Sequence, residues 1–472
     1  MNTRRPGYLK WLLALSLCAS LSGCYGSLPT AVSLSQVDVP ATFKHGSEKN
    51  SHAEDMSDWW ANWHDPALVQ LVDKVVEANI DVRIATARLA EANATQVVVE
   101  SLRHPTIGVG ADVGGGAGEV KWPRIPFLPS NSRSLSDHLE GVSGTLEPDI
   151  FGAKADDANA ALLAALSIRE QLDGIRIVAT TEAAQNYLEA RSLQARLINL
   201  DKGVNALRKL FGYVKARFEA GQAQSYDVLT VEERLRTYES KRPIMLAAID
   251  VRRHHAAILA GLPPGADIVP HSGTRLDLPK TPAVGLPSEV LERRPDVRAR
   301  AVLVEAQALR TNSARKEMLP RFRISFLGGN GRLQFAGIPG FQGTGGLLDL
   351  SVSLPIFTAG RIQANIAEND ARLLQAAAEY DKTVLQALEE VENAYTRRHA
   401  ADQRQGNVRA AMMASRRNRD ITQEMYESGR KTVADVVAAQ IDLIDREDEM
   451  TQAELEAGIA TLNLYAALGG GW

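Results

Sequence analysis

Arg217-Phe218-Glu219-Ala220-Gly221, followed by Asp227, returns later in the chain as Met425-Tyr426-Glu427-Ser428-Gly429, followed by Asp435. The two glycines and the two aspartates are each 208 residues apart, so the turn repeats without a gap. Further motifs repeat at offsets of 215 and 206: Asp81-Val82-Arg83 with Asp296-Val297-Arg298, Pro105 with Pro320, and Ile150-Phe151 with Ile356-Phe357. The chain therefore reads as two copies of one long unit, which favours a scaffold over a single catalytic pocket.

The amino terminus has the pattern of a secretory signal with a lipoprotein cleavage site. Arg4, Arg5 and Lys10 precede an apolar run that ends before Gly23-Cys24. About 11 apolar residues are too few for a membrane-crossing helix, which needs ~20. We expect a signal peptide over residues 1–23 and a lipidated segment over 24–65, with an N-palmitoyl chain and an S-diacylglycerol on Cys24. A chance cysteine behind an ordinary signal is the alternative.

Composition excludes several classes of protein. The formal net charge of the 472 residues is −4, and no basic cluster of the kind that binds nucleic acid is present.

Tyr25 follows the expected anchor where an aspartate would favour the inner membrane, so we expect delivery to the outer membrane. After the signal no apolar run reaches about 18 residues, so a membrane crossing would have to use strands.

Two hairpins with period-2 alternation occupy equivalent places in the two copies. In the first, Ile107, Val109, Ala111 and Val113 alternate with small or polar residues, and a return strand is expected over 139–147. In the second, the strands cover 322–326 and 348–354. A half-buried soluble hairpin gives the same pattern. Four strands cannot close a barrel, so several chains would have to share one, and three chains would supply twelve strands.

The remainder is helix of unusual length. From 360 to 428 there is no proline, and a helical stripe runs through Leu373, Ala377, Tyr380, Val384, Leu388, Val391 and Tyr395. Roughly 69 residues would reach ~100 Å. We expect its counterpart over 153–219, return helices over 226–260 and 434–468, and shorter helical runs over 66–103 and 296–318. The first repeat then covers 66–262, a proline-rich connector with little helix 263–293, and the second repeat 294–472.

Several motifs together resemble the TolC-like outer-membrane efflux lipoproteins of the NodT type. They are Trp59-Trp60, Asp65-Pro66-Ala67-Leu68, Arg293-Arg294-Pro295-Asp296-Val297-Arg298, Leu354-Pro355-Ile356-Phe357, and the closing Leu464-Tyr465-Ala466-Ala467-Leu468-Gly469-Gly470-Gly471-Trp472. The resemblance implies a mixed α and transmembrane β fold: a homotrimer with a twelve-stranded outer-membrane β-barrel, four strands per chain, continuous with a long periplasmic α-helical barrel.

The resemblance also implies a function. The family's channels are the exit ducts of tripartite pumps that export drugs or other toxic compounds. Their partners are a periplasmic adaptor protein, usually an inner-membrane transporter of the resistance-nodulation-division class, and the lipid of the outer membrane. A periplasmic tether without a pore remains the alternative, and nothing in the sequence identifies the cargo.

The resemblance assigns roles to the residues around the repeated turn. Adaptor docking at the tip would fall to Gly221, Gln222, Gln224, Gly429, Arg430 and Lys431, which are otherwise solvated turn residues. The periplasmic gate would be formed by Asp227, Val433, Ala434, Asp435 and Ala438. Relatives commonly carry a carboxylate where this chain has Ala438, so any charge at the constriction would come from Asp227 and Asp435. A purely structural role for Asp435, as the end of a capping box that begins at Thr432, stays open.

No enzymatic motif emerges. His254 and His255 are adjacent and so cannot share a helix face as metal ligands. Gly141-Val142-Ser143-Gly144 lacks the spacing of a nucleophile elbow. We therefore expect no catalytic residue, no metal and no cofactor apart from the lipid on Cys24.

Overall fold

A computed structural model describes residues 37–44, 56, 58–121, 131–270, 278–279, 281–282, 286–335 and 340–470. All of these belong to one compact unit, Val37–Trp472. The expected signal peptide and Cys24 lie outside the described residues.

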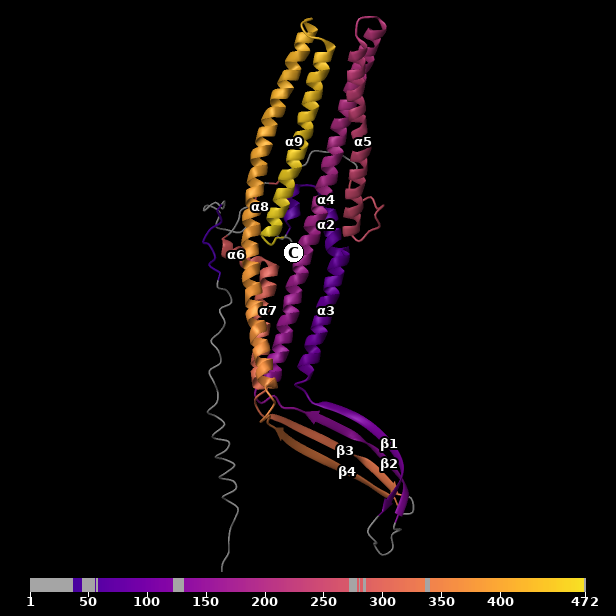
Figure 1. Ribbon diagram of the computed structural model, residues 1–472, viewed down its shortest axis with the longest axis vertical. Coiled ribbons are helices and arrows are strands. Elements are labelled where there is room, and N and C mark those ends of the chain that lie inside the picture. Colours follow the sequence, from indigo (N-terminus) through magenta and orange to yellow (C-terminus); the bar gives the residue numbers. More distant parts are fainter. Residues whose placement is uncertain are drawn as a thin grey trace, which may run out of the picture. The chain divides into compact units, whose positions relative to one another are not determined.

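The same elements occur twice in the same order (Figure 1). A short 3₁₀-helix, η2 (Trp59–Trp63), precedes the first copy. That copy contains α2 (Pro66–Ala78), α3 (Ile80–Ser101), β1 (Thr106–Lys121), β2 (Asn131–Leu146), α4 (Ala153–Glu219) and α5 (Ser225–Leu259). The second contains α6 (Pro287–Arg293), α7 (Pro295–Lys316), β3 (Arg321–Phe335), β4 (Phe341–Ser353), α8 (Arg361–Glu427) and α9 (Val433–Ala467). Because α4 and α8 both have 67 residues and α5 and α9 both have 35, the predicted duplication is confirmed.

Glycines in the left-handed region mark the boundaries of both copies. They form three pairs, each 208 residues apart: Gly152 with Gly360, Gly221 with Gly429, and Gly261 with Gly469. Their φ angles lie between 70° and 83°, a region that costs other residues energy. Since the helix ends fall on the same glycines, the helices after the hairpins repeat with one constant spacing.

Several boundaries differ from those expected. The run expected as one helix over 66–103 is two helices, because Asn79 has an extended ψ of 134° and caps α3. The proline-rich connector contains the short helix α6, which starts at Pro287. The strands are also longer than expected: β2 begins at Asn131 and not at Leu139, β3 ends at Phe335 and not at 326, and β4 begins at Phe341 and not at 348. The break at Asn79 and the added strand residues lie where the sequence has no apolar periodicity that would reveal them.

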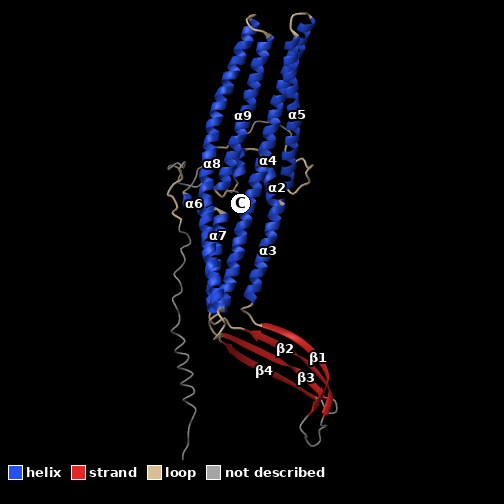
Figure 2. Cartoon of the chain, viewed as in Figure 1, coloured by secondary structure: helices blue, strands red, loops and turns tan. Residues whose placement is uncertain are grey.

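The helices form one layer in which α4 and α8 run the full length (Figure 2). At 67 residues each, they are about 100 Å long. Near the sheet, α4 lies between α3 and α7, and α7 contacts α8. Toward the other end, α4 lies between α5 and α9, and α9 contacts α8. The shorter helices therefore follow one another end to end, α5 beyond α3 and α9 beyond α7.

The strands form one antiparallel sheet in the order β1-β2-β3-β4. The two copies meet at the β2–β3 pair, where Gly141 lies opposite Gly329. β1 and β4 are the edges of the sheet within one chain. The sheet lies at the end of the helix layer opposite the two turns that join α4 to α5 and α8 to α9 (Figure 1).

The main core lies where the short helices meet, midway along the layer. Trp59 stacks on Tyr465 with 5.6 Å between ring centroids and meets Trp60 edge-on at 5.5 Å. The hydroxyl of Tyr187 donates to Asp65 Oδ2 at 2.7 Å. These contacts attach η2 and the start of α2 to α4 and α9. The region therefore holds the short helices in place against the long ones.

Candidate functional site: the helical tips, the Arg294 cluster and the four-stranded sheet

The repeated turn closes both long helices by the same backbone hydrogen bonds. Gly221 N donates to Phe218 O at 2.9 Å and Gln222 N to Arg217 O at 2.8 Å. Gly429 N and Arg430 N make the equivalent bonds at 2.9 and 2.8 Å. This pattern is a Schellman motif, which uses a left-handed glycine to satisfy carbonyls at the end of a helix. Both tips therefore reverse the chain through the same hydrogen-bonded turn.

The returning helices start with reciprocal caps. Thr432 N and Thr432 Oγ1 each donate to Asp435 Oδ2 at 2.9 Å, and Asp435 N donates to Thr432 Oγ1 at 3.3 Å. Gln224 N likewise donates to Asp227 Oδ2 at 3.0 Å. The backbone hydrogen bond from Thr432 holds the pKa of Asp435 below its usual value. Both aspartates therefore act as helix caps, whatever further role they have.

The docking candidates gather at one end of the helix layer. Gln222, Gln224, Arg430 and Lys431 are exposed in the two turns farthest from the sheet (Figure 1). Arg430 Nε donates to Ser428 Oγ at 3.0 Å, and Lys431 Nζ lies 3.8 Å from Asp435 Oδ1. The structure thus places these side chains together at the tip, with their polar groups directed to solvent or to local partners.

The gate candidates divide between faces of α9. Ala434 and Ala438 are exposed and four residues apart, so they share one face, whereas Val433 and Asp435 are half-buried. The face continues to Asp442, which is exposed and accepts a hydrogen bond from Ser415 Oγ at 2.6 Å. The sequence pattern did not single out Asp442. Its spacing of four from Ala438 is the signal that could have found it.

Polar ties fasten the two helical hairpins to each other. The hydroxyl of Tyr238 in α5 donates to Asp445 Oδ1 in α9 at 2.5 Å. Arg196 in α4 binds Asp448 in α9 through two bonds of 2.9 and 3.1 Å. The partners are 207 and 252 residues apart, which explains why sequence patterns did not reveal them. The relative position of the tips therefore depends on these contacts.

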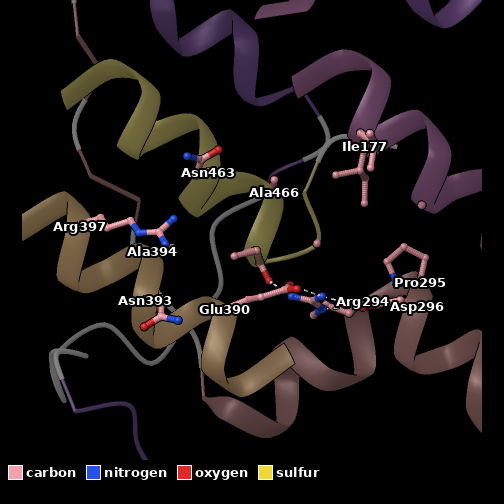
Figure 3. Close-up of a pocket in the computed structure, with 14 residues that line it drawn as sticks. Ile177, Arg294, Pro295, Asp296, Glu390, Asn393, Ala394, Arg397, Asn463 and Ala466 are labelled. Atoms are coloured by element: carbon pink, nitrogen blue, oxygen red, sulfur yellow. Dashed lines mark hydrogen bonds and ion pairs between the residues drawn. The ribbon is translucent and has the colours of Figure 1, made fainter. Parts of the chain in front are cut away.

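The side chain of Arg294 joins α7, α8 and α9 at the point where these helices meet (Figure 3). Its guanidinium binds Asp296 at 2.6 and 3.0 Å, Glu390 Oε2 at 2.7 Å and Ala467 O at 2.9 Å. Its side chain is only 8% exposed, beside a cavity of about 420 Å³. With these partners the charge is neutralised locally, so the cluster is a structural joint.

The described residues hold no group of three or more His, Cys, Asp or Glu side chains that could bind a metal. His255 Nε2 lies 2.8 Å from Glu182 Oε1, which gives it an ordinary surface partner. Within that same part of the chain, no helix has the length and apolarity to span a membrane.

One face of the sheet is apolar and uncovered in the half nearer the helices, whereas the rows beyond it on the same face carry Glu140 and Arg332. In the apolar half, Val109 is 84% exposed and Ile107 is 76%, and Leu348 and Leu350 on the opposite edge strand are 72% and 69%. The register puts Ile107, Phe326 and Leu348 in one row across the sheet. A contiguous apolar surface of this kind marks a lipid or protein contact. An open antiparallel sheet with this face, joined to ~100 Å helices, defines one chain's share of an outer-membrane channel with a periplasmic extension.

Comparison with known proteins identifies the family. The family described as outer membrane efflux protein matches residues 71–242 and 286–470, and the chain belongs to it. The chain is 26% identical to the pyoverdine export outer membrane protein OpmQ of Pseudomonas aeruginosa, over 98% of this chain and 97% of OpmQ. It is 25% identical to nodulation protein T of Rhizobium leguminosarum bv. trifolii, over 92% and 91%. The solved outer-membrane channel OprN matches with a TM-score of 0.81 and 25% identity, over 94% of this chain and 99% of OprN.

The membership confirms what the motifs implied. The solved channels with this fold are trimeric, so the predicted fold class, four strands per chain toward a twelve-stranded barrel continuous with a helical one, is confirmed. The protein is an outer-membrane efflux duct that extends into the periplasm, and it is a channel and not an enzyme.

Proposed function

We propose that three copies close the duct by pairing β1 of one chain with β4 of the next, and that a periplasmic adaptor and an inner-membrane transporter of the resistance-nodulation-division class feed it. The observation that supports this closure is the sheet itself: its two edges are open within one chain, and one face is apolar in the half nearer the helices. Unpaired strand edges are not tolerated in lipid, and β1 and β4 run in opposite directions, as antiparallel closure requires. The transporter then determines which cargo enters the duct.

The duct is tested by conductance. Purified protein with the mass of a trimer should produce single-channel currents in planar bilayers, whereas chains dissociated by heat should produce none. A protein that inserts without conducting would support the pore-free tether and contradict the proposal.

Adaptor docking at the tips rests on their exposure and their distance from the membrane. We propose that Arg430 and Lys431, with Gln222 and Gln224 beside Gly221 and Gly429, receive the helical hairpins of the adaptor. The variant Arg430→Glu/Lys431→Glu should lose cross-linking to the adaptor and drug resistance, while Arg409→Glu, an exposed position elsewhere on α8, should keep both. Full resistance and cross-linking in the tip variant would contradict docking at this surface.

The gate is proposed at the start of the returning helices. Val433, Ala434 and Ala438 would form the apolar part of the closed aperture, and Asp435 with Asp227 would set its charge. Asp435→Asn should lower cation selectivity in bilayer recordings and leave the trimer intact. The control Asp420→Asn removes an exposed carboxylate paired with Arg419 on α8 and should leave selectivity unchanged. Equal selectivity in both variants would reduce Asp435 to the helix cap seen here.

A lipid anchor on Cys24, an N-palmitoyl chain with an S-diacylglycerol, is the last part of the proposal. Two or more acyl chains are enough for stable membrane attachment. Labelled fatty acid should be incorporated into the wild-type protein and not into Cys24→Ser. Continued labelling of that variant would disprove the assignment, and transport in it is expected to persist because the strands hold the channel in lipid.

A further inference from the structure

One row across the sheet consists entirely of glycine. Gly110 pairs with Gly141, Gly141 with Gly329, and Gly329 with Gly345. Directly paired residues of an antiparallel sheet project from the same face, and neighbours along a strand from opposite faces. The row therefore lies on the face opposite Val109 and Leu348, which in the proposed trimer is the face toward the lumen.

The row next to it carries leucines on the same face. Gly108 pairs with Ser143, Ser143 with Leu327, and Leu327 with Leu347. Leu327 is 44% exposed and Leu347 64%. One row closer to the helices, Thr106, Thr145, Ser325 and Asp349 again face the lumen with polar groups. The leucines and the glycine row thus lie between this polar row and the next row beyond the glycines, in which Asp112 pairs with Leu139.

Strand geometry accounts for only half of the glycine row. A Cβ on Gly141 would lie 2.5 Å from Gly328 O, and one on Gly329 would lie 2.3 Å from Glu140 O, so β2 and β3 approach too closely for any side chain. A Cβ on Gly110 or Gly345 would meet nothing within 4 Å. These two glycines are not required by packing. They leave the wall bare beside the leucines.

We infer that the glycine row and the Leu327–Leu347 pair form a cargo-contact section of the lumen that favours bulky apolar molecules. The inference rests on the proposed trimer, in which the section becomes a continuous ring. The backbone groups of the glycines are hydrogen-bonded within the sheet, and glycine has no side chain that could donate or accept a hydrogen bond from cargo. Contact between the leucines and an apolar surface removes water from both and is therefore favourable in free energy. Water and cargo pass along this face of a duct, so cargo is the molecule that contacts the section.

Two cations of equal charge and different apolar surface test the inference. Tetraphenylphosphonium and tetramethylammonium are added to single channels in planar bilayers from the side of the hairpin loops. Tetraphenylphosphonium should block the current for longer intervals, and Leu327→Ala/Leu347→Ala should shorten those intervals by about tenfold, because apolar contact area is lost. Leu348→Ala, the next residue on the opposite face, is the matched control and should leave them unchanged.

Equal intervals for the two cations in the wild type, or wild-type intervals in the double variant, would overturn the inference. A wild-type protein without any current would instead contradict the proposed duct, so the two failures are distinguishable. Independently, Gly345→Phe should lower the conductance of an intact trimer, since its ring enters open space in the lumen. If that variant does not assemble, Gly110→Phe in the same row replaces it, and unchanged conductance or failed assembly in both would show that the row does not face an open lumen.

Discussion

Asn79 and Arg294 occupy equivalent positions, 215 residues apart, and join the halves of the helix layer in the same way. Asn79 Nδ2 donates to Leu259 O, and Arg294 NH1 donates to Ala467 O, both at 2.9 Å. Each residue occupies the N-cap position of the helix that runs toward the sheet, and its side chain binds the last carbonyl of the helix that returns from the tip; Asn79 also accepts cap hydrogen bonds from the first turn of α3. These hydrogen bonds join α5 to α3 end to end, and α9 to α7. Each joined pair therefore acts as one strut that lies beside a long helix.

Asn79→Ala should destabilise the joint of the first copy. The variant loses the bonds from Asp81 N and Val82 N to Asn79 Oδ1 and leaves Leu259 O without this donor. We expect a loss of about 1–3 kcal/mol. Thermal unfolding of the detergent-purified protein, followed by its helical circular dichroism, measures the effect. The control Asn418→Ala changes an exposed helical asparagine and should not lower the Tm; equal Tm values for the two variants would contradict the strut.

Tyr238→Phe should loosen the hairpins from each other. It removes the hydroxyl that donates to Asp445 while the packed ring, 7% exposed, stays in place. Loss of a bond to a charged acceptor predicts about 1–3 kcal/mol of destabilisation. Tyr226→Phe, at a 72% exposed position near the tip, should be neutral. Proteolysis in the α5 and α9 segments should increase in the first variant only; identical digestion patterns would disprove the tie.

Stability should fall as the pH rises above about 10, the usual pKa of tyrosine. Burial, reinforced by the bonds to Asp65 and Asp445, raises the pKa of Tyr187 and Tyr238, and burial raises that of Tyr395 to about 12. Above the unfolded pKa the folded chain keeps protons that the unfolded chain has lost, so this contribution is complete below about pH 10 and disappears as the pH rises through the folded values. The Tm of Tyr187→Phe/Tyr238→Phe should decline less steeply between pH 9 and 12 (approximate limits) than that of the wild type. A parallel decline would assign the pH dependence to other groups.

Gly221→Ala and Gly429→Ala should each destabilise a tip by about 1 kcal/mol, because alanine is strained at φ angles of 72° and 75°. Gly406→Ala is the internal control. It lies inside α8 with open space around a new Cβ, so it should stabilise the helix by ~0.5–1 kcal/mol. Hydrogen exchange of the amides in the last turns of α4 and α8 checks the sign in each case. Slower exchange in the tip variants would contradict the role of these glycines.

Gly329→Ala should prevent the barrel from assembling, since its Cβ would lie 2.3 Å from Glu140 O on the neighbouring strand. Gly343→Ala, where a Cβ meets nothing within 4 Å, is the matched control. The trimer fraction in outer-membrane extracts, measured without heating, should drop for the first variant and remain for the second. Normal trimer levels for Gly329→Ala would mean that the two strands can move apart.

The helices after the hairpins could be placed from the sequence alone. A stripe of period near 3.6 and a repeated left-handed glycine are local signals, and they put the first long helix at Ala153–Glu219 as observed. The break at Asn79 was missed because the apolar stripe of α2 is not continued in α3, so no periodicity marks where the second helix begins. The signal available was an Asn followed two residues later by Asp81, a pattern typical of an N-cap.

The sequence by itself determined the duplication, the long helices, the alternating strands and the turn residues, because each depends on neighbours within a few positions of the chain. Only the tertiary structure decided that Tyr238 meets Asp445, that Arg294 reaches Ala467, and that four glycines share one row. Those contacts join residues as much as 207 positions apart, or depend on a strand register that a shift of one residue would send to the other face. Local periodicity fixes which face of each element is apolar, but packing between elements selects which residues meet across it.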